Sequence, residues 1–161
     1  MATVRTDAYQ LPLPAGWSDR TAVTLAAPAA ADGSVPNLVI TREALCQGLG
    51  LGGFADGHAN LMRDQVAAYE LLSNGWETLD GERTLVRIVR FEVGESALMQ
   101  LQAFFVRDGL GYAICGTATE QSFPEAEPAF REALDGLSFT ALGAAAPPPD
   151  TAPGALQVLR G

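Results

Sequence analysis

The segment from Leu98 to Val106 constrains the fold most, because it predicts a β-strand that is apolar on both faces. Side chains alternate across a strand, so one face carries Met99, Leu101, Ala103 and Phe105. The other face carries Leu98, Gln100, Gln102, Phe104 and Val106. One apolar face is enough to build a core. A second apolar face with two uncharged amides is either covered by protein or binds a partner that is apolar and forms hydrogen bonds.

Composition limits the class of protein. With 161 residues, 48% of them hydrophobic, the chain is long and apolar enough for one globular domain with a substantial core. The formal net charge is −9, and all basic residues are arginine. Nucleic acids and anionic membrane surfaces attract basic proteins, so neither is expected as a partner.

Two features favour a cytoplasmic location. The N-terminal residues show no apolar leader, and no window approaches the roughly 18–20 apolar residues of a membrane helix. The two cysteines, Cys46 and Cys115, each lie in an apolar context, and we expect them to be buried free thiols.

Hydrophobic periodicity predicts strands, a helix, a strand meander and a second helix. The expected strands cover 8–14, 21–26, 37–42, a start at 76–79, then 83–93, 97–107 and 111–119; the expected helices cover 54–73 and 124–137. This order indicates an α+β fold in which helices pack on one face of an antiparallel sheet. The opposite face is left to solvent or to a partner, and it is too apolar for open water. We assign the domain to 1–142 and a Pro/Ala-rich flexible tail to 143–161.

Residues that carry chemistry are few. His58 is the single histidine, and a surface position on a helix is favoured over a dyad with either cysteine. The glycine-rich segment 48–53 is no P-loop, because the chain contains no lysine. The cysteines and the histidine do not have the spacing of a zinc site. We therefore expect no catalytic residues, no metal and no cofactor.

Several sequence pieces resemble the effector-associated gene (Eag) chaperones of bacterial type VI secretion, which belong to the DcrB-like group with a PsbP-like fold. The shared order and spacing of the pieces, over roughly residues 7 to 139, carries the resemblance. The pieces are Leu11-Pro-Leu-Pro with Trp17 and Asp19, Leu38-Val-Ile-Thr-Arg-Glu43, Phe54-Ala-Asp56, Leu98-Met-Gln-Leu-Gln-Ala-Phe-Phe105, Thr117-Ala-Thr119 and Glu127-Pro-Ala-Phe130.

This resemblance implies an intracellular chaperone without catalytic activity. Such chaperones bind the N-terminal transmembrane segments of an effector and help load it on the VgrG spike protein. They act as homodimers whose sheets form a concave apolar cradle, so the resemblance implies that the helix-free face of this sheet forms such a cradle. Gln102 matches a client-contacting glutamine, and Leu38 and Ile40 match apolar positions of the third strand. Ala22 and Thr24 are smaller than the aliphatic residues that family members can carry there, which would widen the groove. The expected client-binding residues are Ala22, Thr24, Leu38, Ile40, Leu98, Gln100, Gln102 and Phe104.

Two alternatives remain open from the sequence. The first is a non-catalytic sheet scaffold that binds or assembles another protein partner. The second, less favoured, is an enzyme with a cysteine nucleophile at Cys46 or Cys115.

Overall fold

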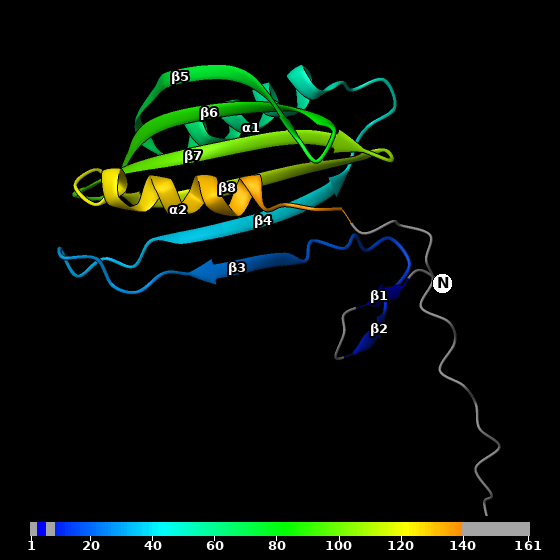
Figure 1. Ribbon diagram of the computed structural model, residues 1–161. Helices are drawn as coiled ribbons and strands as arrows, with labels where there is room; N and C mark the ends of the chain where they lie inside the picture. The colour runs from blue at the N-terminus through cyan, green and yellow to red at the C-terminus, as the bar shows by residue number, and fades with distance from the viewer. Residues whose placement is uncertain (1–2, 6–8, 140–161) are drawn as a thin grey trace, which may run out of the picture.

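The computed structural model describes residues 3–5 and 9–139 (Figure 1). The expected tail, 143–161, lies outside these residues, as does the domain boundary at 142. Among the described residues, no helix is long and apolar enough to cross a membrane.

The centre of the fold is a six-stranded antiparallel sheet with the order β3-β4-β8-β7-β6-β5. Its strands are β3 (Ala22–Ala26), β4 (Asn37–Ala44), β5 (Ala67–Leu79), β6 (Glu82–Val93), β7 (Ser96–Arg107) and β8 (Leu110–Thr119). A separate hairpin joins β1 (Thr3–Arg5) to β2 (Gln10–Pro12), so the expected strand at 8–14 is shorter than predicted. Two helices, α1 (Leu51–Gln65) and α2 (Phe123–Asp135), complete the α+β fold and confirm the predicted class.

The meander from β5 to β8 depends on tight turns that are formed by turn-favouring residue pairs. Asp80-Gly81 joins β5 to β6, and Asp108-Gly109 joins β7 to β8. All four residues have positive φ, between 47° and 80°, as two-residue hairpin turns of type I′ require. The predicted strands 83–93, 97–107 and 111–119 are confirmed within a residue at each end.

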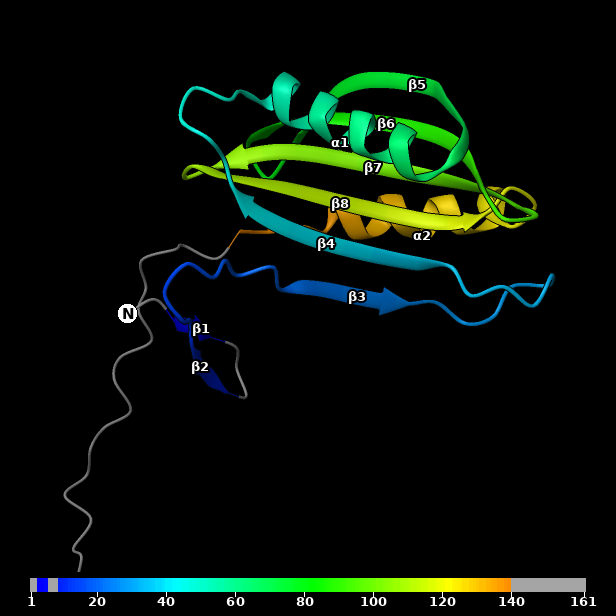
Figure 2. The ribbon, with the colours of Figure 1, turned by 180° about the vertical axis from the view of Figure 1, so that it is seen from behind.

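The two helices pack on opposite faces of the sheet, not on one face as predicted. Figure 1 shows α2 in front of the sheet, and Figure 2, turned by 180°, shows α1 in front of it. We call these sides the α2 face and the α1 face. The apolar residues on both sides of β7 are therefore mostly explained by two separate cores, one under each helix.

The α2 face holds the larger core. Phe123, Phe130 and Leu134 of α2 pack with Leu101 and Phe105 of β7 and their neighbours. Gly116 of β8 lies directly beneath Phe130, where an added Cβ would come within 2.5 Å of the ring. Close approach of helix and sheet at this point therefore requires glycine.

The predicted helix 54–73 is correct only as far as Gln65. Val66 adopts an extended conformation, and from Ala67 the chain forms β5, which pairs with β6 along its length. Leu72, which helical spacing places on the apolar stripe of the predicted helix with Met62, Val66 and Tyr69, is 45% exposed in this strand. The helical spacing of these residues was coincidental, and pairing with β6 determined the structure.

Candidate functional site

The α1 face has one covered half and one open half. α1 packs against β5, β6 and β7, whereas β8, β4 and β3 extend beyond it (Figure 2). Strand pairing places Gln102, Cys115, Val39 and Thr24 in one row across this face. Exposure rises along the row: Gln102 is buried, Cys115 and Val39 are half-buried, and Thr24 is exposed. The open half is therefore a continuous surface that starts beside α1 and ends at the β3 edge.

A polar ladder runs along β7 and β8 on the α1 face. Nε2 of Gln100 donates to Oγ1 of Thr117 at 2.8 Å, and Nε2 of Gln102 donates to Oε1 of Gln100 at 2.7 Å. Oε1 of Gln102 is buried and has no hydrogen-bond partner among the described residues. A buried acceptor without a partner typically costs about 1–3 kcal/mol. The ladder thus ends in Oε1 of Gln102, and a donor that reached this oxygen would form a stabilising hydrogen bond.

α1 covers this ladder with a small set of contacts. Met62 lies over Gln102, and its Sδ is 3.2 Å from Nε2 of Gln102. Phe54 meets the ring of Phe104 edge-on with centroids 5.8 Å apart, and His58 meets the same ring at 5.1 Å. Gln102 and Phe104 are consequently fully buried.

Arg87 of β6 binds the middle of α1 from the sheet side through hydrogen bonds. Its guanidinium donates to the carbonyl of Ala55 at 3.2 Å, to Oδ1 of Asp56 at 2.9 Å and to Oδ1 of Asn74 at 3.2 Å. Arg87 is only 8% exposed, so these bonds satisfy a charge that would otherwise be buried alone.

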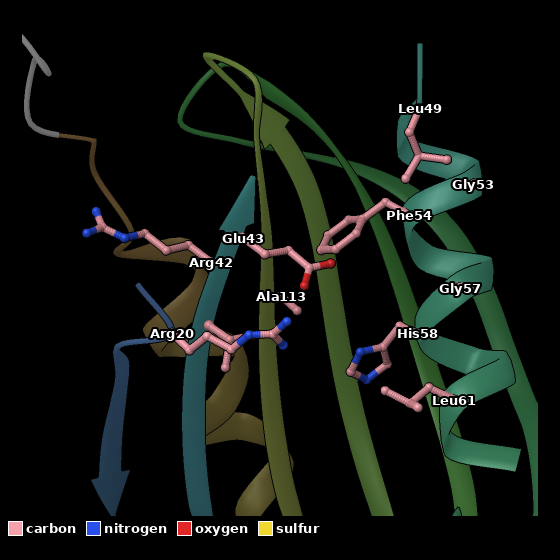
Figure 3. Close-up of a pocket in the computed structure, with 11 residues that line it drawn as sticks. Arg20, Arg42, Glu43, Leu49, Gly53, Phe54, Gly57, His58, Leu61 and Ala113 are labelled. Atoms are coloured by element: carbon pink, nitrogen blue, oxygen red, sulfur yellow. The ribbon is translucent and has the colours of Figure 1, made fainter. Parts of the chain in front are cut away.

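A groove of about 340 Å³ lies between α1 and the open half (Figure 3). One wall is the side of α1 that carries Leu49 just before it and Gly53, Gly57 and Leu61 within it. Phe54, His58 and Ala113 form the base, and Arg20 and Glu43 stand at the sheet side. Thr41 and Arg42 of β4 complete the lining, but Arg42 alternates with Thr41 and Glu43, so its side chain points to the α2 face. Arg42 is paired with Asp19 at 3.1 Å. The groove is mainly apolar, with charge along one side.

His58 is the titratable group at the base of the groove. Burial lowers its pKa from 6.5; the nearby Glu43 carboxylate opposes this effect, and Arg87 adds to it. The histidine is therefore neutral at neutral pH and packs as an aromatic side chain against Phe104.

The expected client-binding residues fall into four groups in the structure, three of them on the α1 face. Ala22 and Thr24 are exposed on the open half, and Leu98 and Gln100 are half-buried on the same face. Gln102 and Phe104 share that face but lie under α1.

Leu38 and Ile40 were placed incorrectly. They alternate with Val39 and Thr41, so they point to the α2 face and pack with the core around Phe130. Leu38 is only 6% exposed. They cannot share a surface with Gln102, because neighbouring residues of a strand point to opposite faces.

Sequence reasoning missed most of the groove. Val39 and Thr41 have the same parity as Ala22 and Thr24, but this became clear only from the β3–β4 register. Arg87, His58 and Met62 belong to the site because α1 lies on this face, and no local pattern shows on which face a helix will pack.

Cys115 has the environment of an unreactive thiol. Burial raises the pKa of the Cys115 thiol to about 12, so it stays protonated at neutral pH, and a thiol is a far weaker nucleophile than a thiolate. Cys46 is exposed, contrary to its predicted burial, whereas Cys115 is half-buried. No group of three or more candidate metal ligands occurs within residues 3–5 and 9–139.

Two solved structures share this fold. One is a Pseudomonas aeruginosa protein of unknown function, PA94, which has been suggested to be a regulator; it has a TM-score of 0.74 and 20% identity, over 87% of this chain and 97% of that one. The other is the cyanobacterial PsbP (CyanoP) of Synechocystis sp. PCC 6803, with a TM-score of 0.50 and 13% identity, over 81% of this chain and 86% of that one. At these identities the likeness shows the fold alone.

Sequence comparison identifies the family. A search of curated proteins found no match. The sequence profile named DcrB, in contrast, matches residues 9–136, which include the whole six-stranded sheet and both helices. The chain therefore belongs to the DcrB family.

Proposed function

We propose that this protein is a non-catalytic chaperone that shields an apolar helix of a client protein on the open half of its α1 face. The observation that carries the proposal is the mainly apolar groove between α1 and strands β4 and β8, together with the small, exposed side chains of Ala22 and Thr24 on the same face. An apolar helix needs such a surface when no membrane is present.

The dimensions of the open half suit one helix. Adjacent strands lie about 4.8 Å apart, so three strands span about 10 Å between the outer two. An α-helix with its side chains is about 10–12 Å across. The small residues Ala22, Thr24 and Ala113 leave room for the client's own side chains, whereas Leu61 and Phe54 offer apolar contact from α1.

The polar groups of the same face suit a helix with small polar residues. Gln100 is half-buried at the margin of the open half, and its amide is already oriented by Thr117. A client helix with glycine or serine exposes donors and acceptors that an apolar wall alone would leave unsatisfied.

The identity of the client rests on the resemblance to Eag chaperones. On this basis the client is the N-terminal transmembrane segment of a type VI secretion effector, and the chaperone assists loading of that effector on VgrG. We also propose a homodimer, in which the edge strand β3, with Val23 and Leu25 52% and 53% exposed, provides an apolar contact area.

A second candidate is a scaffold that binds a protein partner without apolar helices. The solvent-exposed rings of Trp17 and Trp76, 71% and 50% exposed, favour it, because exposed tryptophans are typical of protein interfaces.

Co-purification separates the two candidates. The protein is co-expressed with the effector encoded beside its gene, either intact or lacking its N-terminal apolar segment. The chaperone proposal predicts recovery of the intact effector and loss of the shortened one. Equal recovery of both forms would favour the scaffold, and recovery of neither would contradict both for this client.

A further inference from the structure

α1 is an unusually weak helix for an element that covers a core. Gly52, Gly53 and Gly57 lie within it, and each glycine inside a helix lowers its stability relative to alanine. Its N-cap, Gly50, makes no capping side-chain hydrogen bond, and its first turn has no acidic residue. Only Phe54, Ala55 and Ala59 of this helix are buried.

The surface beneath α1 is imperfectly satisfied while α1 covers it. Oε1 of Gln102 has no partner, and Nε2 of the same amide reaches the Met62 thioether, which is a weak acceptor. If α1 left the sheet, solvent or a client could bond with this amide. The unpaired amide oxygen of Gln102 therefore destabilises the state in which α1 covers the sheet.

We infer that α1 leaves the sheet by local unfolding, and that an apolar client helix with a serine or threonine hydroxyl takes its place over Gln102. This inference rests on the proposed function and extends it to a second, covered half of the site. The hydroxyl donates to Oε1 of Gln102, which α1 does not. The apolar residues Leu85 and Phe104, now under α1, would then pack against the client.

Chain connectivity agrees with this motion. Two glycines, Gly48 and Gly50, lie in the segment that leads into α1, and Gly48 has a φ of +85°. After the helix, the chain passes directly into β5 through Val66. The unfolded segment therefore stays attached at a flexible end and at the long β5–β6 pairing, so the sheet itself remains intact.

The first test is hydrogen exchange of the protein without any client. We expect the amides of α1 to exchange through a local opening, much faster than those of β7. Gly52→Ala should slow the exchange of α1 about fivefold, because Gly52 is exposed, has no atom within 4 Å of an added Cβ, and does not line the groove. Gly75→Ala in β5 is the matched control: it also has open space, and it should leave α1 exchange unchanged.

The second test measures binding of a labelled synthetic probe. The probe is a helix of about 20 leucine and alanine residues with one central serine, partitioned between detergent micelles and the protein. If the client replaces α1, its affinity scales with the open fraction, so Gly52→Ala should weaken binding by the same fivefold factor. Replacing the probe's serine with alanine should weaken binding to the wild type but not to Gln102→Met.

The outcomes distinguish this inference from the function on which it rests. Exchange of α1 only with global unfolding would overturn the inference. The inference would also be overturned if Gly52→Ala bound the probe with unchanged affinity while Thr24→Asp on the open half abolished binding. That pair of results would leave the proposed function standing. A probe that binds none of the proteins, including the wild type, would overturn both.

Discussion

Met62 of α1 and Gln102 of β7 are in direct contact, with Sδ 3.2 Å from Nε2. The contact places the glutamine expected to meet a client beneath a helix of its own chain. It also divides the α1 face into the open half, which any partner can reach, and a covered half, which requires movement of α1.

Replacing Arg87 should loosen α1 and destabilise the whole domain. Arg87→Met removes the hydrogen bonds to the Ala55 carbonyl, to Asp56 and to Asn74, so the packing of α1 on β6 loses three polar contacts. We expect the free energy of unfolding to fall by about 2 kcal/mol, measured by urea denaturation. Asp56→Asn is the comparison: Asp56 has a 68% exposed side chain, so loss of this ion pair should cost less than about 1 kcal/mol. Equal effects would show that Arg87 acts only through its ion pair.

Acid should destabilise the domain through His58. Its pKa in the folded state lies below 6.5, so the unfolded chain binds more protons as pH falls from 6.5 to the folded-state value. Stability should therefore decrease over this range and level off below it. In urea titrations at several pH values, His58→Phe should remove this part of the pH dependence. An identical pH profile for the variant and the wild type would contradict the burial of His58.

Thiol labelling should distinguish the two cysteines. Cys46 is exposed and should react with a thiol reagent at neutral pH, whereas Cys115, with its pKa raised to about 12, should react much more slowly until the protein unfolds. Full client recovery by Cys46→Ser and Cys115→Ser variants is expected from a non-catalytic chaperone. Loss of function in either variant with the fold intact would instead favour the cysteine enzyme.

Light scattering should give a mass about twice the chain mass of 16.9 kDa at micromolar concentration. Exposed apolar residues on the β3 edge favour such association. A monomer under these conditions would contradict the proposed homodimer.

The sequence predicted the sheet better than the helices. Alternation from Arg83 to Thr119 and the turn pairs Asp-Gly determine three strands and their order. The helix prediction is wrong over 67–73, because Tyr69 and Leu72 continue the helical spacing of Met62 and Val66, whereas the predicted strand start at 76–79 is confirmed. Pairing with β6 determines the structure of this segment, and no local pattern shows that pairing.

The candidate site was predictable only in part, for a geometric reason. Alternation places Leu38 and Val39 on opposite faces of the sheet, but it does not show which of the two shares a face with Gln102. That depends on the β4–β8 and β7–β8 registers, which bring Val39 and Gln102 to opposite sides of Cys115. Leu38→Asp would consequently damage the α2 core and would not report on client binding.

The most direct measurement compares two substitutions on β3 that place a carboxylate on opposite faces of the sheet. Thr24 points to the α1 face, and Val23, its neighbour, points to the α2 face; both are exposed, so a carboxylate at either position should leave the fold intact. Co-purification with the client is measured for Thr24→Asp and Val23→Asp. The account predicts that Thr24→Asp lowers client recovery at least about tenfold, because a charge in contact with an apolar helix must be desolvated. Val23 belongs to the proposed dimer contact but not to the groove, which lies within one chain, so Val23→Asp should recover the client at the wild-type level whether or not it dimerises. Equal recovery by both variants, or loss confined to Val23→Asp, would contradict binding on the α1 face.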